Sequence, residues 1–543
     1  MTKYDISVKI FLSAFYAGKG DVPVCMSKKT KNKIKSLVRI IFGRTMVVAA
    51  GLALQIFFIV SSLLFFRDNF VFFSAASSIL SLIVLIWIIN DKTNPYYKLA
   101  WVLPVMLIPV FGTLMYIFVK TEFGTHVMNR RILSLIEDTS PFIPQDETTL
   151  NELEAISEGE KNLAVYMKKY AGYPIWKNTS AEYYPLGEDA FAAMLRELEK
   201  AEKFIFMEYF IVERGIMWDT ILEVLERKAA QGVDVRFMYD GMCSLVLVPY
   251  SYPRELEKKG IKCKMFSPIK PVLSTVQNNR DHRKILVVDG HTAFTGGVNL
   301  ADEYINKYEK FGHWKDTAVM IKGEAAAGFT MMFLQSWNIT EQNPDDYGKY
   351  IPSEFKPEGN TDGFVMPYGD SPLDNENVGQ NVYIDILHRA KKYVHIMTPY
   401  LILDNEMIQA LTFAAKRGVD VVIIMPHVPD KLYAYLLARS YYAELISAGV
   451  KIYEYTPGFV HAKVFVSDDE RAVVGSINLD YRSLFLHFEC ACYFYKNPVV
   501  AQVEEDVQST MKKCFMVTLD DCRRYNIFKK LVGQILRVFA PLM

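Results

Sequence analysis

The chain has 543 residues, which at roughly 150 residues per domain predicts about three or four structural units. Its hydrophobic fraction of 51% excludes a disordered protein, and its charged fraction of 22% excludes a protein embedded in a membrane throughout. Lysine plus arginine equals aspartate plus glutamate, at 61 each, so the chain as a whole lacks the positive field expected of a duplex nucleic-acid binder.

Three uncharged apolar runs lie in the first 120 residues: Thr45 to Phe66, Phe70 to Ile89, and Leu99 to Val119. Each has about 20 residues, long enough at 1.5 Å per residue to cross a hydrocarbon core of ~30 Å. None has a polar face, so we predict a membrane anchor of two or three transmembrane helices over 45–120. Pro104, Pro109 and Gly112 predict a kink or a re-entrant turn in the third run.

The basic arm ahead of the anchor, residues 1–44, is expected in the cytoplasm because lysines and arginines favour that side. The protein is therefore predicted to be a multi-pass protein of the cell membrane. Three crossings would place the remainder of the chain outside the cytoplasm, and two would leave it inside; the sequence leaves both open.

Beyond residue 178 the same arrangement occurs twice. An apolar run, an amphipathic stretch, a glycine and a second apolar run begin at Lys203 and again at Lys392, an offset of 189 residues. Continuous apolar runs of this kind predict β-α-β units with buried strands. Because solenoid repeats recur every 20 to 50 residues, the long offset indicates a duplicated domain.

The predicted organisation after the anchor follows from this repeat. A polar, mostly helical connector comes first, and a stretch rich in Pro, Gly, Asp and Asn separates the two halves as a linker. A basic amphipathic tail, which either binds a membrane surface or packs on the protein body, ends the chain. The boundaries are 121–177 for the connector, 178–342 for the first half, 343–376 for the linker, 377–522 for the second half and 523–543 for the tail.

Each half contains one His-x-Lys-x4-Asp motif. Since His and Lys are two residues apart, an extended strand presents both side chains on one face. A turn of small residues and an asparagine follow each motif, with seventeen residues from His to Asn in both halves. The residues are His282, Lys284 and Asp289 with Gly296, Gly297 and Asn299, and His461, Lys463 and Asp468 with Gly475, Ser476 and Asn478.

Two imidazoles, two ammonium groups and two amides that converge on one place suit a phosphodiester. Lysine charge neutralises the non-bridging oxygens and stabilises five-coordinate phosphorus. One imidazole can attack phosphorus while the other protonates the leaving oxygen. We expect no metal and no cofactor, because the sequence contains no cluster of carboxylates to hold a cation.

The duplicated motif resembles that of the phospholipase D superfamily, and the resemblance covers the chain from about Asn178 to its end. It implies an α/β phospholipase D fold of two halves with pseudo-twofold symmetry, mixed sheets flanked by helices and a site at the seam. By position, His282 corresponds to the nucleophile and His461 to the general acid, although the reverse stays open. Asp289 and Asp468 belong to the motif, but they lie too far along a strand to reach the same phosphate, so we expect them to brace it.

Within the superfamily the chain is similar to bacterial cardiolipin synthases. The resemblance lies in NRDHRK from Asn279, GGVNLADEY from Gly296, HWKDT from His313 and GSINLDYRS from Gly475, and the segment from Asn94 to Tyr116 resembles the family's membrane anchor. It implies that Asp316 and Glu489 each orient an imidazole, and that Glu208 and Asp240 are either site residues or structural acids. Arg482 and Ser483 also match, whereas His487 stands where Asn is usual and Asp281 stands where Asn is expected.

The resemblance implies the joining of two phosphatidylglycerol molecules into cardiolipin and glycerol through a phosphatidyl-histidine intermediate. The expected partners are phosphatidylglycerol and cardiolipin in the membrane, with no nucleic acid. Alternatives are hydrolysis to phosphatidic acid and transfer to another alcohol such as serine. An endonuclease fits poorly with zero net charge and an anchor, and a lipid-binding scaffold without turnover would have lost a His or Lys of the motifs, all of which are present.

Overall fold

The computed structural model describes residues 53, 55–57, 60–61, 70–120, 123–269, 278–355, 358–374 and 376–542. The basic arm and most of the first predicted membrane segment lie outside these residues. Contacts divide the chain into two units, which are described separately. The smaller unit comprises residues 1–93, 101–122 and 270–275, and the larger comprises 94–100, 123–269 and 276–543.

In the smaller unit, helix α4 (Phe70–Asn90) corresponds to the second apolar run. The third run is not one continuous helix: α5 (Pro95–Leu107) ends before Ile108 and α6 (Pro109–Lys120) begins with a proline, which cannot donate a helix hydrogen bond. Val84, Ile88, Val105 and Tyr116 form a small buried cluster.

Among the helices of the described residues, none combines the length and the apolar character needed to cross a membrane. The two or three transmembrane helices predicted from the sequence are therefore not confirmed.

The first half of the larger unit is built on a seven-stranded mixed sheet within the described residues, in the order β1-β9-β7-β6-β2-β3-β4. Strands β2, β3 and β4 are parallel, and β6 runs antiparallel to β2. The strands are β1 (Thr179–Tyr184), β2 (Phe204–Tyr209), β3 (Asp234–Asp240), β4 (Lys262–Phe266), β6 (Lys284–Val288), β7 (Thr292–Gly296) and β9 (Ala318–Gly323).

The second half repeats this order as β10-β17-β16-β15-β11-β12-β13, with β18 added at the edge. The matching order confirms the α/β fold with two duplicated halves and mixed sheets. The strands are β10 (Phe364–Asp370), β11 (Tyr393–Met397), β12 (Asp420–Pro426), β13 (Lys451–Tyr455), β15 (Val464–Ser467), β16 (Arg471–Gly475), β17 (His487–Tyr495) and β18 (Cys514–Val517).

Strand β10 corrects the expectation that 343–376 is only a linker. Phe364 to Asp370 pair antiparallel with β17 along the whole strand. The proline and glycine inside this strand hid it in the sequence, although an edge position tolerates both.

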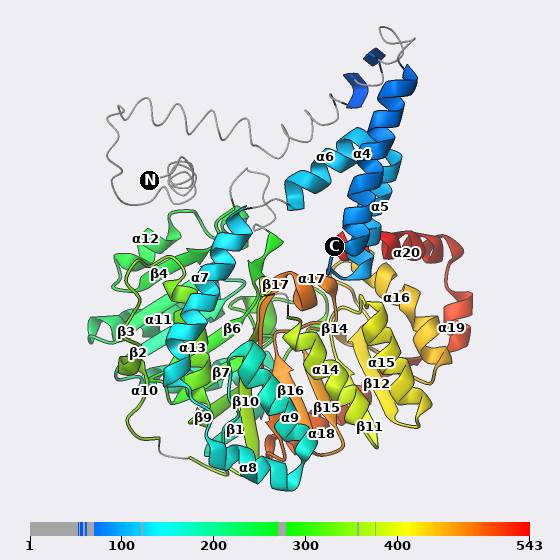
Figure 1. Ribbon diagram of the computed structural model, residues 1–543. Coiled ribbons are helices and arrows are strands. Elements are labelled where there is room, and N and C mark those ends of the chain that lie inside the picture. Colours follow the sequence, from blue (N-terminus) through cyan, green and yellow to red (C-terminus); the bar gives the residue numbers. More distant parts are fainter. Residues whose placement is uncertain are drawn as a thin grey trace, which may run out of the picture. The chain divides into compact units, whose positions relative to one another are not determined.

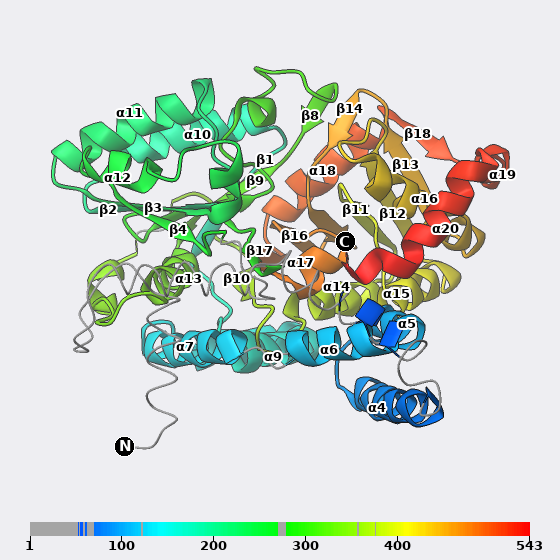
Figure 2. The same ribbon diagram turned by 90° about the horizontal axis from the view of Figure 1, so that it is seen from above.

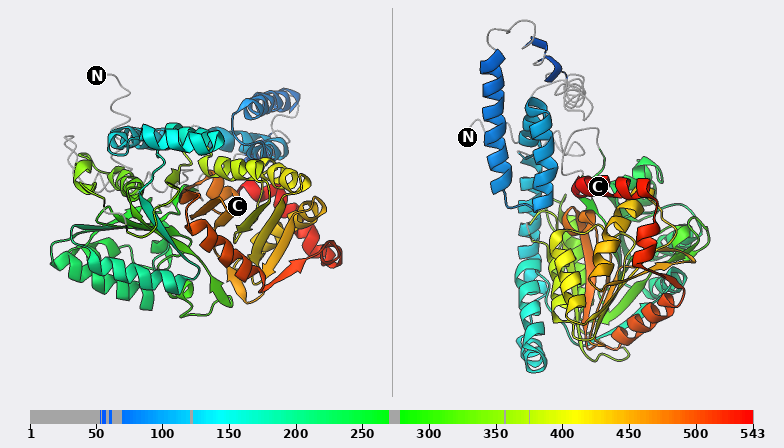
Figure 3. Two further views of the ribbon diagram at one scale, coloured as in Figure 1. Left: turned by 90° about the horizontal axis from the view of Figure 1, so that it is seen from below. Right: turned by 90° about the vertical axis from the view of Figure 1, so that its right-hand side faces the viewer.

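Helices cover both faces of each sheet (Figure 1, Figure 2 and Figure 3). In β2, Ile205 and Met207 point into the core shared with α10 and α11, whereas Phe204 and Phe206 point into the core shared with α13. The second half repeats this arrangement with α14 and α15 on one face and α18 on the other (Figure 2). The bounds are α10 (Gly187–Lys200), α11 (Ile216–Ala230), α12 (Tyr252–Glu257), α13 (Ala326–Asn338), α14 (Val378–Arg389), α15 (Asn405–Lys416), α16 (Leu432–Ser447), α17 (Tyr481–Phe485), α18 (Val499–Met511), α19 (Leu519–Arg524) and α20 (Ile527–Phe539).

The connector is helical, as its pattern predicts, and forms α7 (Phe123–Thr139), α8 (Glu147–Ile156) and α9 (Glu158–Tyr166). It ends where Trp176 forms a bridge with Val365 of β10.

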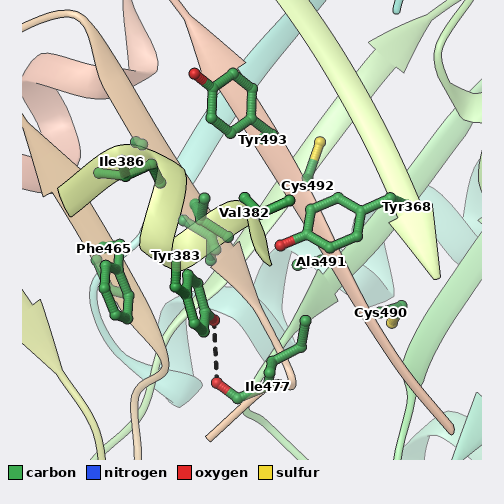
Figure 4. Close-up of a cluster of buried hydrophobic side chains, with 14 of the residues drawn as sticks. Tyr368, Val382, Tyr383, Ile386, Phe465, Ile477, Cys490, Ala491, Cys492 and Tyr493 are labelled. Carbon is green, nitrogen blue, oxygen red and sulfur yellow. Dashed lines mark hydrogen bonds between the residues drawn. The ribbon is translucent and has the colours of Figure 1, made fainter. Parts of the chain in front are cut away.

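The core of the second half reaches the turn that follows its motif. The rings of Tyr383 and Phe465 stack with centroids 3.9 Å apart. The Tyr383 hydroxyl donates a hydrogen bond of 3.1 Å to the carbonyl oxygen of Ile477 (Figure 4). Ile477 lies between Ser476 and Asn478, so this packing fixes the backbone of a turn that carries candidate site residues.

Candidate active site

Two short parallel strand pairings join the halves, and each ends one residue before a motif histidine. In the first, β5 (Arg280–Asp281) pairs with the start of β17, in the register Asp281 to Phe488. The next residues are His282 and Glu489, and His282 N–H donates to the Phe488 carbonyl at 2.9 Å. The pairing therefore sets the first histidine beside an acid of the second half.

The second pairing mirrors the first. Strand β14 (Gly458–Val460) pairs with β8 (His313–Lys315), in the register Val460 to Lys315. His461 and Asp316 come next, and His461 N–H donates to the Lys315 carbonyl at 2.7 Å. Each half thus supplies a histidine to the acid of the other half.

Both imidazoles are held through Nδ1. His282 Nδ1 lies 2.8 Å from Oε1 and 3.0 Å from Oε2 of Glu489. His461 Nδ1 lies 2.6 Å from Oδ2 of Asp316. A carboxylate at Nδ1 favours the tautomer with its proton there, which leaves Nε2 with a free lone pair for attack or proton transfer. The structure places the acids that the family resemblance singled out against the two histidines.

The two motif lysines are buried beside the imidazoles. Lys284 opens β6 and Lys463 directly precedes β15, and each Nζ donates to the carbonyl oxygen of its own motif histidine. Burial lowers the pKa of Lys284 to about 8 and that of Lys463 to about 7. An anion bound beside them would restore both charges, because an opposite charge favours the ionised form.

Burial also lowers the pKa of both histidines. It lowers the pKa of His461 to about 4, with the charge of Lys463 as the next cause. The pKa of His282 lies well below its usual value, chiefly through burial and then through the charge of Lys284. In the free protein both imidazoles are therefore neutral at neutral pH, which suits a nucleophile. A bound anion would raise these pKa values again, because an opposite charge favours the protonated imidazole.

Gly297 and Ser476 stand beside the two orienting acids. A Cβ on Gly297 would lie 2.0 Å from Oδ1 of Asp316, so only glycine leaves room for that carboxylate. Ser476 instead donates its hydroxyl hydrogen to Glu489 Oε2. Both small residues therefore position an acid.

The two asparagines are committed to their own turns. Asn299 accepts a hydrogen bond from Ile211 N–H at 3.0 Å and donates to the Tyr304 hydroxyl at 2.9 Å. Asn478 donates to the Ser483 hydroxyl at 3.0 Å. These contacts give both amides a positioning part, in addition to the substrate contact predicted for them.

Asp289 and Asp468 are not brought to the imidazoles. Asp289 directly follows β6, which begins at Lys284, and Asp468 directly follows β15, which begins one residue after Lys463. Each carboxylate accepts three backbone N–H bonds from the segment that opens a central strand, and these bonds brace the motif strand against its neighbour. The donors are Glu202, Lys203 and Phe204 for Asp289, and Lys391, Lys392 and Tyr393 for Asp468.

Glu208 and Asp240 pair with the arginines that flank the first histidine. Glu208 lies 2.7 Å from Arg283, and Asp240 lies 3.6 Å from Arg280. Asp240 also accepts the backbone N–H of Asp281 at 3.0 Å. These acids hold the segment around the motif and occupy structural positions.

Aromatic rings surround both histidines, which the motif pattern did not reveal. The rings of Phe210 and His487 lie 4.9 Å and 5.5 Å from that of His282. Trp314 lies 5.4 Å from His461. His487 and Trp314 each precede an orienting acid by two residues, and this spacing could have flagged them.

His487 is buried, and neither ring nitrogen has a hydrogen-bond partner in the described structure. His487, His282 and Glu489 each offer one possible metal-ligand atom, and these three atoms lie within 4.8 Å of one another. This spacing could hold a metal ion. The sequence did not show this group, because its members come from both halves. Two of the three residues, His282 and Glu489, are already hydrogen-bonded to each other. The expectation that the site works without a metal stays a prediction.

Two family comparisons match the chain. The family described as "Cardiolipin synthase, PLD-like domain" matches residues 194–337 and 383–511, which include both motifs and together make up half of the chain. The chain belongs to this family. A second family, "Phospholipase_D-nuclease N-terminal", matches residues 79–120. Membership makes the protein an enzyme of the phospholipase D superfamily.

Two relatives match this chain over most of their own length. A cardiolipin synthase of Alkalihalophilus pseudofirmus is 34% identical over 460 residues, which cover 83% of this chain and 90% of that protein. A protein of Streptococcus mutans is 49% identical over 458 residues, covering 84% and 99%. Among solved structures, a phosphatidylserine synthase of Haemophilus influenzae aligns with a TM-score of 0.53 and 16% identity over 69% of this chain and 96% of that one, which shows a shared fold.

Proposed function

We propose that the protein is a cardiolipin synthase, which transfers a phosphatidyl group from one phosphatidylglycerol molecule to another and releases glycerol. The observation that carries the proposal is the pair of histidines at the seam, each held by an acid of the opposite half and flanked by a buried lysine. The family membership and the names of the full-length relatives support the choice of lipid.

In the first half-reaction, Nε2 of His282 attacks the phosphorus of a bound phosphatidylglycerol. The bond between phosphorus and the glycerol oxygen breaks, and His461 delivers its proton to that oxygen, so that glycerol leaves. Glu489 stabilises the charge that develops on His282. Lys284 and Lys463 hold the non-bridging oxygens, where negative charge grows as phosphorus becomes five-coordinate.

In the second half-reaction, a headgroup hydroxyl of a second phosphatidylglycerol attacks the phosphatidyl-histidine. His461, now neutral, accepts the hydroxyl proton, and the bond between His282 and phosphorus breaks. The products are cardiolipin and an enzyme in its starting protonation state. The buried, aromatic surroundings of both histidines favour the alcohol over water as the acceptor.

Both substrates and the product are membrane lipids, so we include membrane association in the proposal. The named cardiolipin synthases among the relatives support it. Multi-pass insertion through residues 45–120 stays part of the proposal, with the basic arm 1–44 in the cytoplasm.

Product analysis tests the proposal. The purified full chain is incubated with phosphatidylglycerol vesicles, and a His282→Ala variant prepared in the same way serves as the control. We expect cardiolipin and free glycerol in equal amounts from the native chain and neither from the variant. Phosphatidic acid without cardiolipin would identify a hydrolase, and absence of any turnover would contradict an enzymatic function.

A further inference from the structure

Helix α20, near the end of the chain, packs on the protein body through a narrow side that contains Gly533, Leu536 and Arg537. Its buried residue is Gly533, where a Cβ would lie 2.6 Å from the carbonyl oxygen of Leu436 in α16. Arg537 forms an ion pair of 2.8 Å with Glu444, and its guanidinium lies 4.2 Å from the ring centroid of Tyr441. A close backbone contact and an arginine pair therefore hold one side of α20 against α16.

The opposite side of α20 is apolar and exposed. Positions 528, 531, 535 and 538 follow one another at helical spacing, and 527, 532 and 539 widen the stripe on the same side. The exposed fractions are 69% for Ile527, 75% for Phe528, 58% for Leu531, 42% for Val532, 51% for Ile535, 47% for Val538 and 47% for Phe539.

This orientation is the reverse of that of a helix on a globular protein in water, where the apolar stripe faces the core. The close approach at Gly533 and the pair between Arg537 and Glu444 fix the rotation of the helix, so the exposure follows from packing. A contiguous apolar stripe of this size marks an interaction surface.

The charges around the stripe specify the partner. No acidic residue occurs from Ile527 to Phe539, while Lys529 and Lys530 lie in its first turn. From residue 519 onward the chain has five basic and two acidic residues, and of the basic ones Arg537 is paired with Glu444 on the inner side. An apolar stripe with basic flanks fits the interface of an anionic bilayer, in which apolar side chains enter the acyl boundary and lysines contact headgroups.

Other exposed apolar side chains lie near the catalytic end of the strands. Leu245 and Val246, which follow β3, are 58% and 87% exposed, and Leu432, which follows β12, is 62% exposed. Strands β2 and β3 end near the motif lysine of β6. In Figure 1, α12, α17 and α20 lie along one side of the larger unit.

We propose that α20 lies in the plane of an anionic lipid surface, with its apolar stripe inserted and its inner side bound to α16. This contact is separate from the predicted membrane anchor and does not depend on the proposed reaction. It would hold the strand ends that carry the two histidines against the membrane.

Photocrosslinking identifies what the stripe contacts. A benzophenone side chain replaces Leu531 in the full chain, and an otherwise identical chain carries it at Lys392, a 73% exposed residue at the opposite end of the strands. Both are reconstituted with equimolar phosphatidylglycerol and phosphatidylcholine vesicles. We expect at least tenfold more lipid adduct from position 531 than from position 392, and less in vesicles of phosphatidylcholine alone. A crosslinked product of twice the chain mass, or equal lipid adducts at both positions, would overturn the proposal.

A second comparison separates insertion from folding. With benzophenone at Phe528, Leu531→Glu combined with Ile535→Glu should lower the lipid adduct at least tenfold. Phe413→Glu, which changes a 53% exposed residue of α15, should leave the adduct unchanged. Unfolding midpoints should agree between the variants, since the substituted side chains face away from the body. Retention of the adduct in the double variant would contradict the inserted orientation.

Discussion

The two halves build the same acid-histidine contact with different parts. In the first half a short acid, Asp316, reaches across the seam and lies directly against Gly297. In the second half a longer acid, Glu489, reaches across and accepts the hydroxyl of Ser476. The two halves therefore position the acid in different ways. The shorter aspartate needs the space that a glycine leaves, whereas the longer glutamate receives a hydrogen bond from a serine.

The residues that precede the acids differ as well. Trp314 stands two residues before Asp316, whereas His487 stands two residues before Glu489. Each ring lies close to the histidine that its acid holds, at 5.4 Å and 5.5 Å. His282 therefore has a second imidazole beside it, at the position where His461 has an indole. This difference distinguishes the two duplicated halves.

The largest expected effect comes from removing either imidazole. His282→Ala and His461→Ala should each lower cardiolipin formation by at least 10²–10⁴-fold, the usual worth of a general acid or base, with a larger loss at the nucleophile. Rapid denaturation at mildly alkaline pH should trap a phosphatidyl adduct on His282 of the native chain, because the phosphorus–nitrogen bond is cleaved in acid. An adduct on His461 in the native chain would exchange the two roles, and near-native turnover in either variant would contradict the two-histidine mechanism.

Removing a buried ammonium should cost activity and raise stability. Lys463→Met should lower turnover about 10²–10³-fold, because a charge aimed at the phosphate is lost. Burial lowers the pKa of Lys463 from 10.5 to about 7, so its charge destabilises the free fold by a few kcal/mol. Below pH 7 Lys463 is charged in both the folded and the unfolded chain, and the gain in unfolding free energy of the variant is then largest.

The stability difference between Lys463→Met and the native chain should depend on pH. From pH 7 to 10.5 the folded chain releases the Lys463 proton before the unfolded chain does, so the native protein becomes more stable as pH rises. The advantage of Lys463→Met should shrink over this range, as measured by denaturant unfolding at several pH values. A variant less stable than the native chain at pH 6 would contradict the argument.

Gly297→Ala tests the need for space beside Asp316. The added Cβ would lie 2.0 Å from the Asp316 carboxylate and would push it from Nδ1 of His461. We expect turnover to fall about 10- to 100-fold, as is typical when a group that orients a catalytic residue is disturbed. The unfolding midpoint serves as the control for folding. Unchanged turnover would show that the close contact between Gly297 and Asp316 is not needed for activity.

Ser476→Ala is the milder counterpart in the second half. It removes one hydrogen bond to Glu489 while leaving the contact of His282 with that acid. A typical hydrogen bond contributes about 0.5–1.5 kcal/mol net, so turnover should fall roughly two- to tenfold. A loss larger than that of Gly297→Ala would reverse the ranking of the two turns.

The smallest effect is expected from chelation. If His282, His487 and Glu489 hold no cation in the working enzyme, a chelator should leave turnover unchanged, and His487→Phe should lower it less than tenfold through loss of one neutral donor. Loss of activity in chelator, restored by one stoichiometric metal and absent in His487→Phe, would show that the group binds a functional ion.

Local patterns of the sequence predicted much of the fold. The apolar runs at Lys203 and Lys392 became central β-α-β units, and the two-residue spacing of His and Lys placed both at one strand end. Strand β10 was missed because Pro367 and Gly369 interrupt its apolar pattern. Its pairing with β17 depends on residues more than a hundred positions away, which local propensity does not encode.

The sequence predicted which residues belong to the site better than it predicted which of them contact one another. Family resemblance supplied Asp316 and Glu489, but that each acid crosses to the other half depends on the parallel pairings of β5 with β17 and β14 with β8. The reversed orientation of α20 was equally hidden, because an amphipathic pattern shows that two faces differ without showing which face meets the body.

The crossed pairings also decide when the enzyme can become active during synthesis. His282 gains its acid only after residue 489 has been made, 207 positions later, and His461 depends on an acid 145 positions earlier. A nascent chain that carries only the first half holds a histidine without its orienting partner. The active arrangement therefore forms only late in synthesis, and a truncated or half-folded product should have no activity on phospholipid.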